Sequence, residues 1–90
     1  MMKFEFDPEK AKNNIKKHGI SFAEVEPVFF DALALTIEDD SVLEQRFITV
    51  GLDTKLRLLT ICWTQRGESI RLISARLATS NERKSYENGI

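Results

Sequence analysis

The hydrophobic residues of this sequence follow two different periods. Between residues 7 and 30 they recur three or four positions apart, as on one side of a helix. Between residues 33 and 77 they alternate with polar residues, as in β-strands that are covered on one face. The change of period predicts an α+β fold in which helices come first and a sheet follows.

A short strand and a capped helix are predicted at the N-terminus. Charged and apolar residues alternate over residues 3–6, which favours a short strand at the edge of a sheet. Asp7 is a good helix cap, and Pro8 suits the first helical position because its missing N–H has no partner there. The helix should run to about His18, since Gly19 is a typical residue after a helix end.

A second helix is predicted directly after the first. Residues 21–24, Ser-Phe-Ala-Glu, form a capping box, and hydrophobic residues follow at helical spacing. Pro27 falls about six residues into this segment, where an interior proline costs about 3 kcal/mol. We therefore expect a short or bent helix.

The alternating part of the sequence predicts four strands, at residues 33–37, 46–52, 56–65 and 69–77. The connections between them are short, which favours an antiparallel meander with both helices on one face and the other face partly open. We expect one α+β domain over residues 1–90. It would contain two N-terminal helices on a four-stranded antiparallel meander, with a short N-terminal edge strand and a short C-terminal helix.

The last strand and the residues after it form the most unusual stretch of the chain. Residues 69–77 have apolar side chains on both faces but include Arg71 and Arg76, which alternation places on opposite faces unless the strand twists or bulges. A capping box at residues 79–82 then predicts a helix with almost no apolar residue. Its composition is more typical of a site than of a core, because it carries Arg83, Lys84 and Tyr86.

The distribution of charge points in the same direction. The 90 residues carry a net charge of −1, but residues 1–44 hold five Lys/Arg and ten Asp/Glu, whereas residues 45–90 hold eight and four. The C-terminal half therefore suits an anionic partner such as a phosphate backbone, although the overall sign argues against strong nonspecific nucleic-acid binding. No apolar run is long enough for a membrane span, and the single cysteine, Cys62, fits the cytoplasm.

Three blocks of sequence resemble the BrnT family of type II toxins, in the right order and over nearly the whole chain. They are Asp7-x-x-Lys-Ala-x-x-Asn-x-x-Lys-His-Gly-Ile-x-Phe22, Glu44-x-Arg-Phe-Ile-x-Val-Gly51 and Arg71-x-Ile-Ser-Ala-Arg-x-Ala-Thr-x-x-Glu-Arg-x-x-Tyr-Glu87. The resemblance implies a fold similar to RelE-type ribonuclease toxins and a cytoplasmic RNA-cleaving activity that arrests translation. It also implies a BrnA-type antitoxin, a dimeric ribbon-helix-helix DNA-binding protein that masks the toxin, so operator DNA would be contacted only through the complex.

A ribonuclease without a metal must help a 2′-hydroxyl attack the phosphate, stabilise the negative charge that develops and protonate the leaving oxygen. We predict that Arg76 and Arg83 hold the phosphate, and that Tyr86 or His18, the only histidine, moves protons. Further RNA contacts are predicted for Lys17, Arg71 and Lys84. No cofactor and no metal are expected, because the few candidate ligands lack the spacing of a metal site.

Each of these residues also has a structural interpretation. Arg76 could pair with Glu82 and Arg83 with Glu87, and Tyr86 could simply dock the helix. His18 could cap the last turn of its helix, Lys17 could be part of a solvated face, and Arg71 could be buried. The corresponding alternative function is a noncatalytic interaction module whose basic face docks a partner protein.

Overall fold

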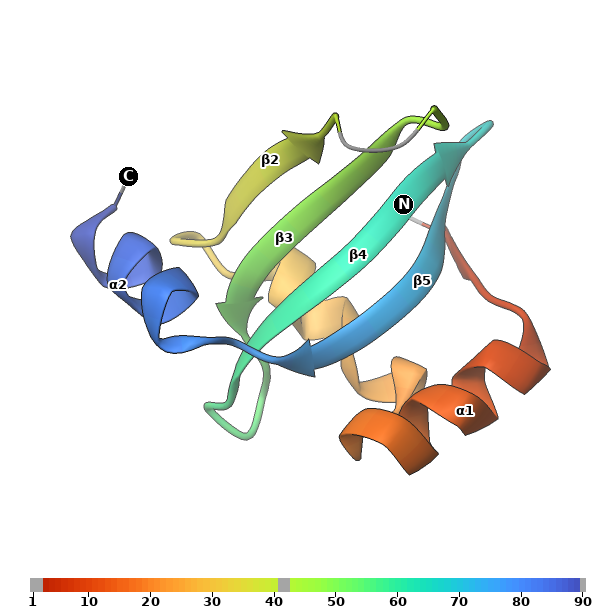
Figure 1. The fold of residues 1–90 in the computed structure, drawn as a ribbon, viewed down its shortest axis with the longest axis horizontal. Helices are drawn as coiled ribbons and strands as arrows, with labels where there is room; N and C mark the ends of the chain where they lie inside the picture. Colours follow the sequence, from red (N-terminus) through yellow and green to blue (C-terminus); the bar gives the residue numbers. More distant parts are fainter. Residues whose placement is uncertain (1–2, 41–42, 90) are drawn as a thin grey trace.

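The computed structural model describes residues 3–40 and 43–89. Five strands form one mixed sheet in the order β1-β5-β4-β3-β2, with α1 beneath the β5 side and α2 beside the β2 and β3 side (Figure 1). In chain order the elements are β1 (Lys3–Glu5), α1 (Pro8–His18), the 3-10 helices η1 (Phe22–Glu24) and η2 (Glu26–Phe30), β2 (Leu35–Asp39), β3 (Arg46–Leu52), β4 (Leu58–Arg66), β5 (Ser69–Leu77) and α2 (Ser80–Asn88).

The predicted four-stranded antiparallel meander is wrong, although the α+β class is right. Strands β2 to β5 pair antiparallel in chain order, but β1 joins the sheet as a fifth strand, parallel to β5, with Phe4 opposite Ile70. The aromatic ring of Phe4 lies 5.2 Å from that of Phe29, so burial of this side chain fixes the first strand against the last one. Short connections could not reveal this pairing, because it joins opposite ends of the chain.

The first predicted helix is confirmed at both ends. The Asp7 carboxylate accepts a hydrogen bond from the Glu9 amide, and Gly19 adopts a left-handed conformation with φ of 72°. The side of the helix that faces the sheet includes a polar residue. Asn14 is buried, whereas Ile15 is 50% exposed.

The second predicted helix is wrong, since two 3-10 helices take its place. Pro27 lacks the N–H that an α-helix interior requires, and the structure accommodates it in the first turn of η2. The two short helices still bury their apolar side chains against the sheet, so the segment contributes to the core as a regular helix would have done. These side chains are Phe22, Val25 and Val28.

In Figure 1 the two 3-10 helices lie behind the sheet, on the side of the hydrophobic core, and α1 lies beside β5. Trp63 of β4 is at the border of this core, and its indole N–H donates to the Thr49 hydroxyl. Among the described helices, only α2 lies against the opposite face of β2 to β5, at one side (Figure 1). No described helix has the length and apolar character needed to cross a lipid bilayer.

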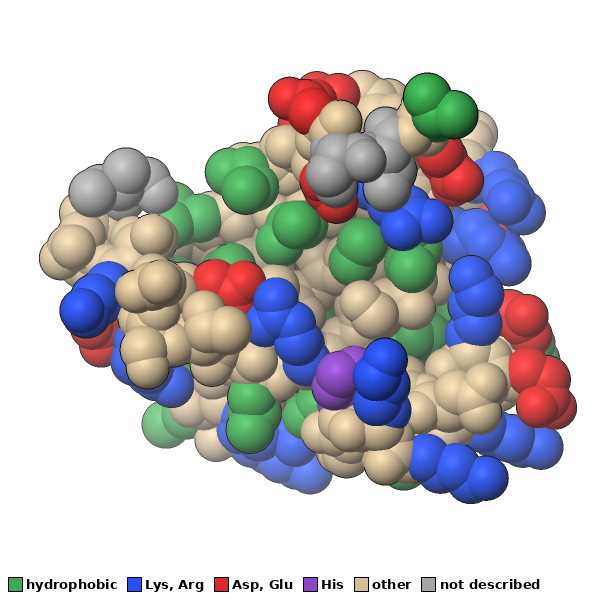
Figure 2. Space-filling view, viewed as in Figure 1, with side chains coloured by type: hydrophobic (Ala, Val, Ile, Leu, Met, Phe, Trp, Pro, Cys, Tyr) green, Lys and Arg blue, Asp and Glu red, His purple; other side chains and the backbone are tan. Residues whose placement is uncertain are grey.

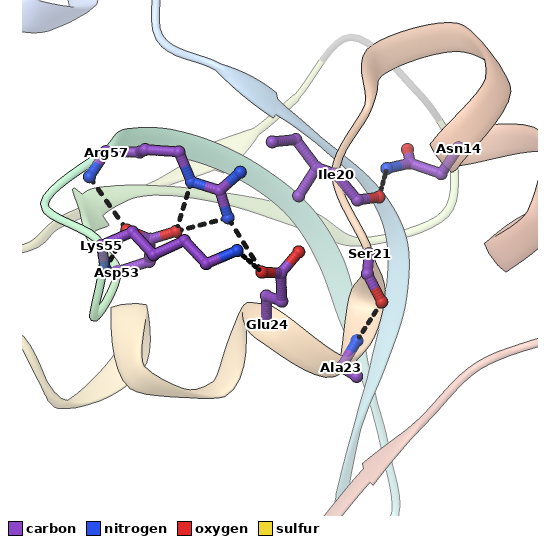
Figure 3. A network of polar contacts seen from close by, with 8 residues as sticks. All are labelled: Asn14, Ile20, Ser21, Ala23, Glu24, Asp53, Lys55 and Arg57. Carbon is purple, nitrogen blue, oxygen red and sulfur yellow. Dashed lines mark hydrogen bonds and ion pairs between the residues drawn. The ribbon is translucent and has the colours of Figure 1, made fainter.

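A polar network fixes the turn between β3 and β4 against η1 (Figure 3). The Asp53 carboxylate accepts a hydrogen bond from Arg57 Nε at 2.8 Å, and Arg57 and Lys55 both form ion pairs with Glu24. Burial raises the pKa of Asp53, but its hydrogen bonds from Arg57 and Lys55 outweigh burial and hold that pKa below its usual value. The turn is therefore held by structural charges, which lie outside the site described next.

Candidate functional site on the open face of the sheet

Three rows of side chains cross the open face of the sheet, because residues paired across strands point to the same side. Neighbouring rows are separated by two residues along a strand, and each row consists of residues that pair with one another from β2 to β5. The rows are Asp39, Arg46, Thr64 and Arg71; Ile37, Ile48, Cys62 and Ser74; and Leu35, Val50, Thr60 and Arg76. Two of the rows are apolar on β2 and β3 and polar on β4 and β5, whereas the row that contains Asp39 and Arg46 is polar throughout.

A β-bulge brings Arg71 and Arg76 to this same face. Cys62 pairs with Ser74, but the next residue of β4, Trp63, pairs with Leu72, so that β5 contains one extra residue at Ile73. Arg71 therefore lies opposite Thr64 and Arg76 opposite Thr60, two positions on the same side of β4. Strict alternation would have put the two arginines on opposite faces. With Arg46, they form what we call the arginine patch.

The apolar side of the open face forms a groove next to α2. It has a volume of about 310 Å³ and is lined by Leu35, Ile37, Ile48 and Val50, together with Glu82 and Ser85 of α2. We call it the apolar groove. The Ile37 side chain is 63% exposed, so this surface is accessible to a partner. Hydrophobic side chains gather in the middle of this face and Lys and Arg side chains flank them (Figure 2).

Arg76 is held in place by a carboxylate. Its Nη1 and Nη2 donate to the two Glu82 carboxylate oxygens at 2.8 and 3.0 Å, and Nη1 also donates to the Leu77 carbonyl. Within the described residues its Nε makes no hydrogen bond, so the Nε side of the guanidinium is available to an anion. This bidentate pair, with hydrogen bonds from Thr79 and Thr60, lowers the pKa of Glu82 to about 2.

Arg46 was not among the predicted site residues, but the structure places it in the arginine patch. Its Nε is buried and lacks a hydrogen-bond partner among the described residues, and its cross-strand neighbour on β2 is Asp39. Cys62 lies between Arg46 and Arg76; burial raises the pKa of its thiol and the two arginines oppose this shift. The sequence held a signal for Arg46, because it alternates in phase with Ile48 and Val50.

Arg71 lies at the far end of the patch and is partly engaged. Its Nη1 is 3.5 Å from a carboxylate oxygen of Glu5 on β1, and the side chain is partly buried. Arg71 was predicted either to contact RNA or to be buried. The ion pair with Glu5 orients its side chain and leaves part of it exposed.

His18 and Lys17 lie beside the middle row of the open face. Both line a shallow pocket of about 230 Å³ between α1 and β5, which includes Ser74. Asn14 fixes this arrangement by accepting a hydrogen bond from the Ala75 amide at 3.0 Å and donating to the Ala75 carbonyl at 2.8 Å. The end of α1 is thus held against the segment of β5 that leads into Arg76, and Figure 2 shows the histidine beside a Lys or Arg side chain.

The helix α2 does not bring its own candidates to the patch. The Tyr86 hydroxyl donates to the Asp31 carboxylate at 2.6 Å, and this bond raises the pKa of Tyr86 to about 12. Arg83 and Lys84 are exposed and form no ion pair with the described residues. At 100° per residue, Arg83 lies on the Tyr86 side of the helix and away from Ser85, which lines the groove. Arg76 and Arg83 are therefore not joined in one site.

The described residues contain no group of three or more His, Cys, Asp or Glu that could hold a metal ion. The chemistry available on the open face and its pocket is that of guanidinium groups, one imidazole, the two lysines Lys10 and Lys17, hydroxyl groups, one thiol and the carboxylates that pair with arginines; the cationic and hydroxyl groups suit a phosphodiester.

Residues 6–82 match a family model that describes ribonuclease toxins of type II toxin-antitoxin systems. Within that class the matching family is BrnT, and the chain belongs to it. In fold it is similar to the crystal structure of the Brucella abortus ribonuclease toxin BrnT, with a TM-score of 0.71 and 24% sequence identity; the match covers 89% of this chain and all of that one. No curated protein matches the sequence.

Proposed function

We propose that this chain is the ribonuclease toxin of a type II toxin-antitoxin system, and that it cleaves RNA on the arginine patch without a metal. The observation that carries the proposal is the bulge at Ile73, which puts Arg71 and Arg76 on one open face with Arg46. Guanidinium groups bind phosphate oxygens through paired N–H donors, and the free Nε side of Arg76 offers such a pair.

The proposed reaction is an internal transesterification. The 2′-oxygen bonds to phosphorus, its proton passes to His18, and the bond from phosphorus to the 5′-oxygen breaks as that oxygen takes up a proton from a water molecule, whose hydroxide is neutralised by the proton on His18. Arg76 and Arg46 stabilise the extra negative charge on the phosphate. Lys17 and Arg71 contact the strand on either side, and Arg83 and Lys84 contact RNA that extends over α2.

Incubation of the purified protein with RNA in EDTA tests this mechanism. We expect fragments that end in a 2′,3′-cyclic phosphate and begin with a 5′-hydroxyl, which mass spectrometry identifies. Fragments with a 5′-phosphate, or cleavage that requires added Mg²⁺, would contradict it. Expression of the chain alone in bacteria should stop growth by arresting translation.

The remaining parts of the proposal rest on the family to which the chain belongs. The toxin acts in the cytoplasm, and a ribbon-helix-helix antitoxin of the BrnA type neutralises it and connects it to operator DNA. A gel-shift experiment tests the connection: the complex should retard operator DNA, and the toxin alone should not.

A further inference from the structure

We propose that the apolar groove is the docking site of the antitoxin, and that its occupant is an amphipathic helix with acidic residues on the flank that faces the arginine patch. This inference takes the identity of the partner from the proposed function. Leu35, Ile37, Ile48 and Val50 form a continuous apolar surface on β2 and β3, which a polyanion such as RNA would not use.

The dimensions of the groove fit a helix. The row that contains Ile37 and Ile48 lies two residues along the strand from the row that contains Leu35 and Val50, a distance of about 6.6 Å. Residues i and i+4 of a helix are separated by about 6 Å along its axis, so one apolar side can reach both rows.

Charge complementarity indicates that the docked helix carries acidic residues on the flank next to the arginine patch. Glu82 at the border of the groove already shows that a carboxylate placed there forms a bidentate pair with Arg76. Arg46 lies two residues before Ile48 on β3, in the next row, and its Nε has no hydrogen-bond partner among the described residues. A second carboxylate, on the docked helix, would supply one. The antitoxin would then fill the groove and also block the phosphate site.

Addition of a strand to the edge of β2 is a different mode of binding that the geometry disfavours. A strand paired to β2 would extend the sheet in its own plane, so it would leave Ile48, which belongs to the next strand, uncovered. Docking across the face covers both strands.

The test measures the affinity of the fluorescently labelled cognate antitoxin for wild-type toxin and for single variants. Ile37→Ser and Ile48→Thr should each weaken binding at least tenfold, and Arg46→Gln should weaken it and reduce its dependence on salt. Ile15→Ser is the matched control, since Ile15 is 50% exposed on α1 and away from the groove. It should bind as the wild type does.

Affinities of Ile37→Ser and Ile48→Thr within twofold of the wild type would overturn the inference. A second result would also overturn it: amide exchange that slows in the complex only at residues 35–39, with normal binding of Ile48→Thr. That result would mean that the partner adds a strand to β2. A toxin homodimer that Ile37→Ser dissociates would also overturn it by assigning the groove to a second copy.

Cleavage by the free toxin separates this inference from the proposed function. Ile37→Ser should cleave RNA at the wild-type rate, since Ile37 is on β2 and its row across the sheet contains none of the three arginines. An inactive wild-type chain whose complex still depends on Ile37 would contradict only the function. An active chain whose complex is indifferent to Ile37 would contradict only the docking site.

Discussion

The two halves of the open face have the same backbone architecture and opposite chemistry. On β2 and β3 the outward positions are the apolar Leu35, Ile37, Ile48 and Val50, with Asp39 and Arg46 at one end, and on β4 and β5 they are Thr60, Cys62, Thr64, Ser74, Arg71 and Arg76. The apolar half follows from strict alternation, whereas the polar half depends on one extra residue in β5. Partner binding and catalysis can therefore be separated by substitution, which the following predictions use.

The largest effect is expected from Arg76→Ala. Loss of the phosphate clamp should reduce RNA cleavage about 100- to 1,000-fold, as removal of one transition-state donor does in other enzymes. The folded structure should persist by circular dichroism. Arg66→Ala is the matched control, because the ion pair that Arg66 forms with the described residues is a long one, 3.8 Å to Glu5, and the variant should cleave normally. Equal activity of Arg76→Ala and wild type would remove the arginine patch from the mechanism.

The next effect concerns the connection between α1 and the patch. Asn14→Leu keeps a side chain of similar size but leaves the buried N–H and C=O groups of Ala75 without partners. Urea denaturation should show a loss of about 2–4 kcal/mol. Asn13→Leu, on the exposed side of the same helix, should change stability by less than about 0.5 kcal/mol. Similar losses in both variants would show that Asn14 does not fix the helix.

A smaller effect is expected from Glu82→Gln, and it should depend on pH. Glu82 has its pKa lowered from 4.5 to about 2, so its stabilisation is complete above pH 4.5 and is lost as the pH falls towards 2. The variant should be less stable by on the order of 2 kcal/mol at pH 7. Urea denaturation at pH 2 should give nearly the same free energy of unfolding for the variant and the wild type. If the difference in free energy is the same at pH 7 and pH 2, ionisation of Glu82 does not cause it.

The smallest effect is expected from Tyr86→Phe. Removal of the hydroxyl breaks the 2.6 Å bond to Asp31 and should cost about 1 kcal/mol of stability. RNA cleavage by this variant should remain within twofold of the wild type, because the hydroxyl serves to dock α2. A tenfold loss of cleavage without a loss of stability would instead assign Tyr86 to proton transfer.

Much of the fold was predictable because local chemistry determines it. Asp7, Pro8 and Gly19 fixed the first helix, and the Thr79 to Glu82 capping box fixed the start of α2. Pro27 signalled the conflict that the 3-10 helices resolve, although their geometry did not follow from it. The parallel pairing of β1 with β5 could not be predicted, since no local pattern specifies a partner about 65 residues away.

The site was predictable in its residue types and less so in its arrangement. Arg76 and the pocket with His18 lie on the open face, but the predicted partnership of Arg76 with Arg83 assumed that α2 presents its cations to the sheet. Instead α2 turns Glu82 inward, because this residue completes both the capping box and the Arg76 pair. A one-residue bulge leaves no clear mark in the sequence, so the convergence of Arg71 and Arg76 required the structure.

Titration of the protein with a 2′-O-methyl RNA, which binds but cannot be cleaved, tests the central claim most directly. Two-dimensional NMR should show the largest shifts at the Arg76 Nε–H and at the amides of Cys62, Thr64 and Ser74, which lie within the arginine patch. Shifts confined to the outer side of α2, with the Arg76 signal unchanged, would contradict the account.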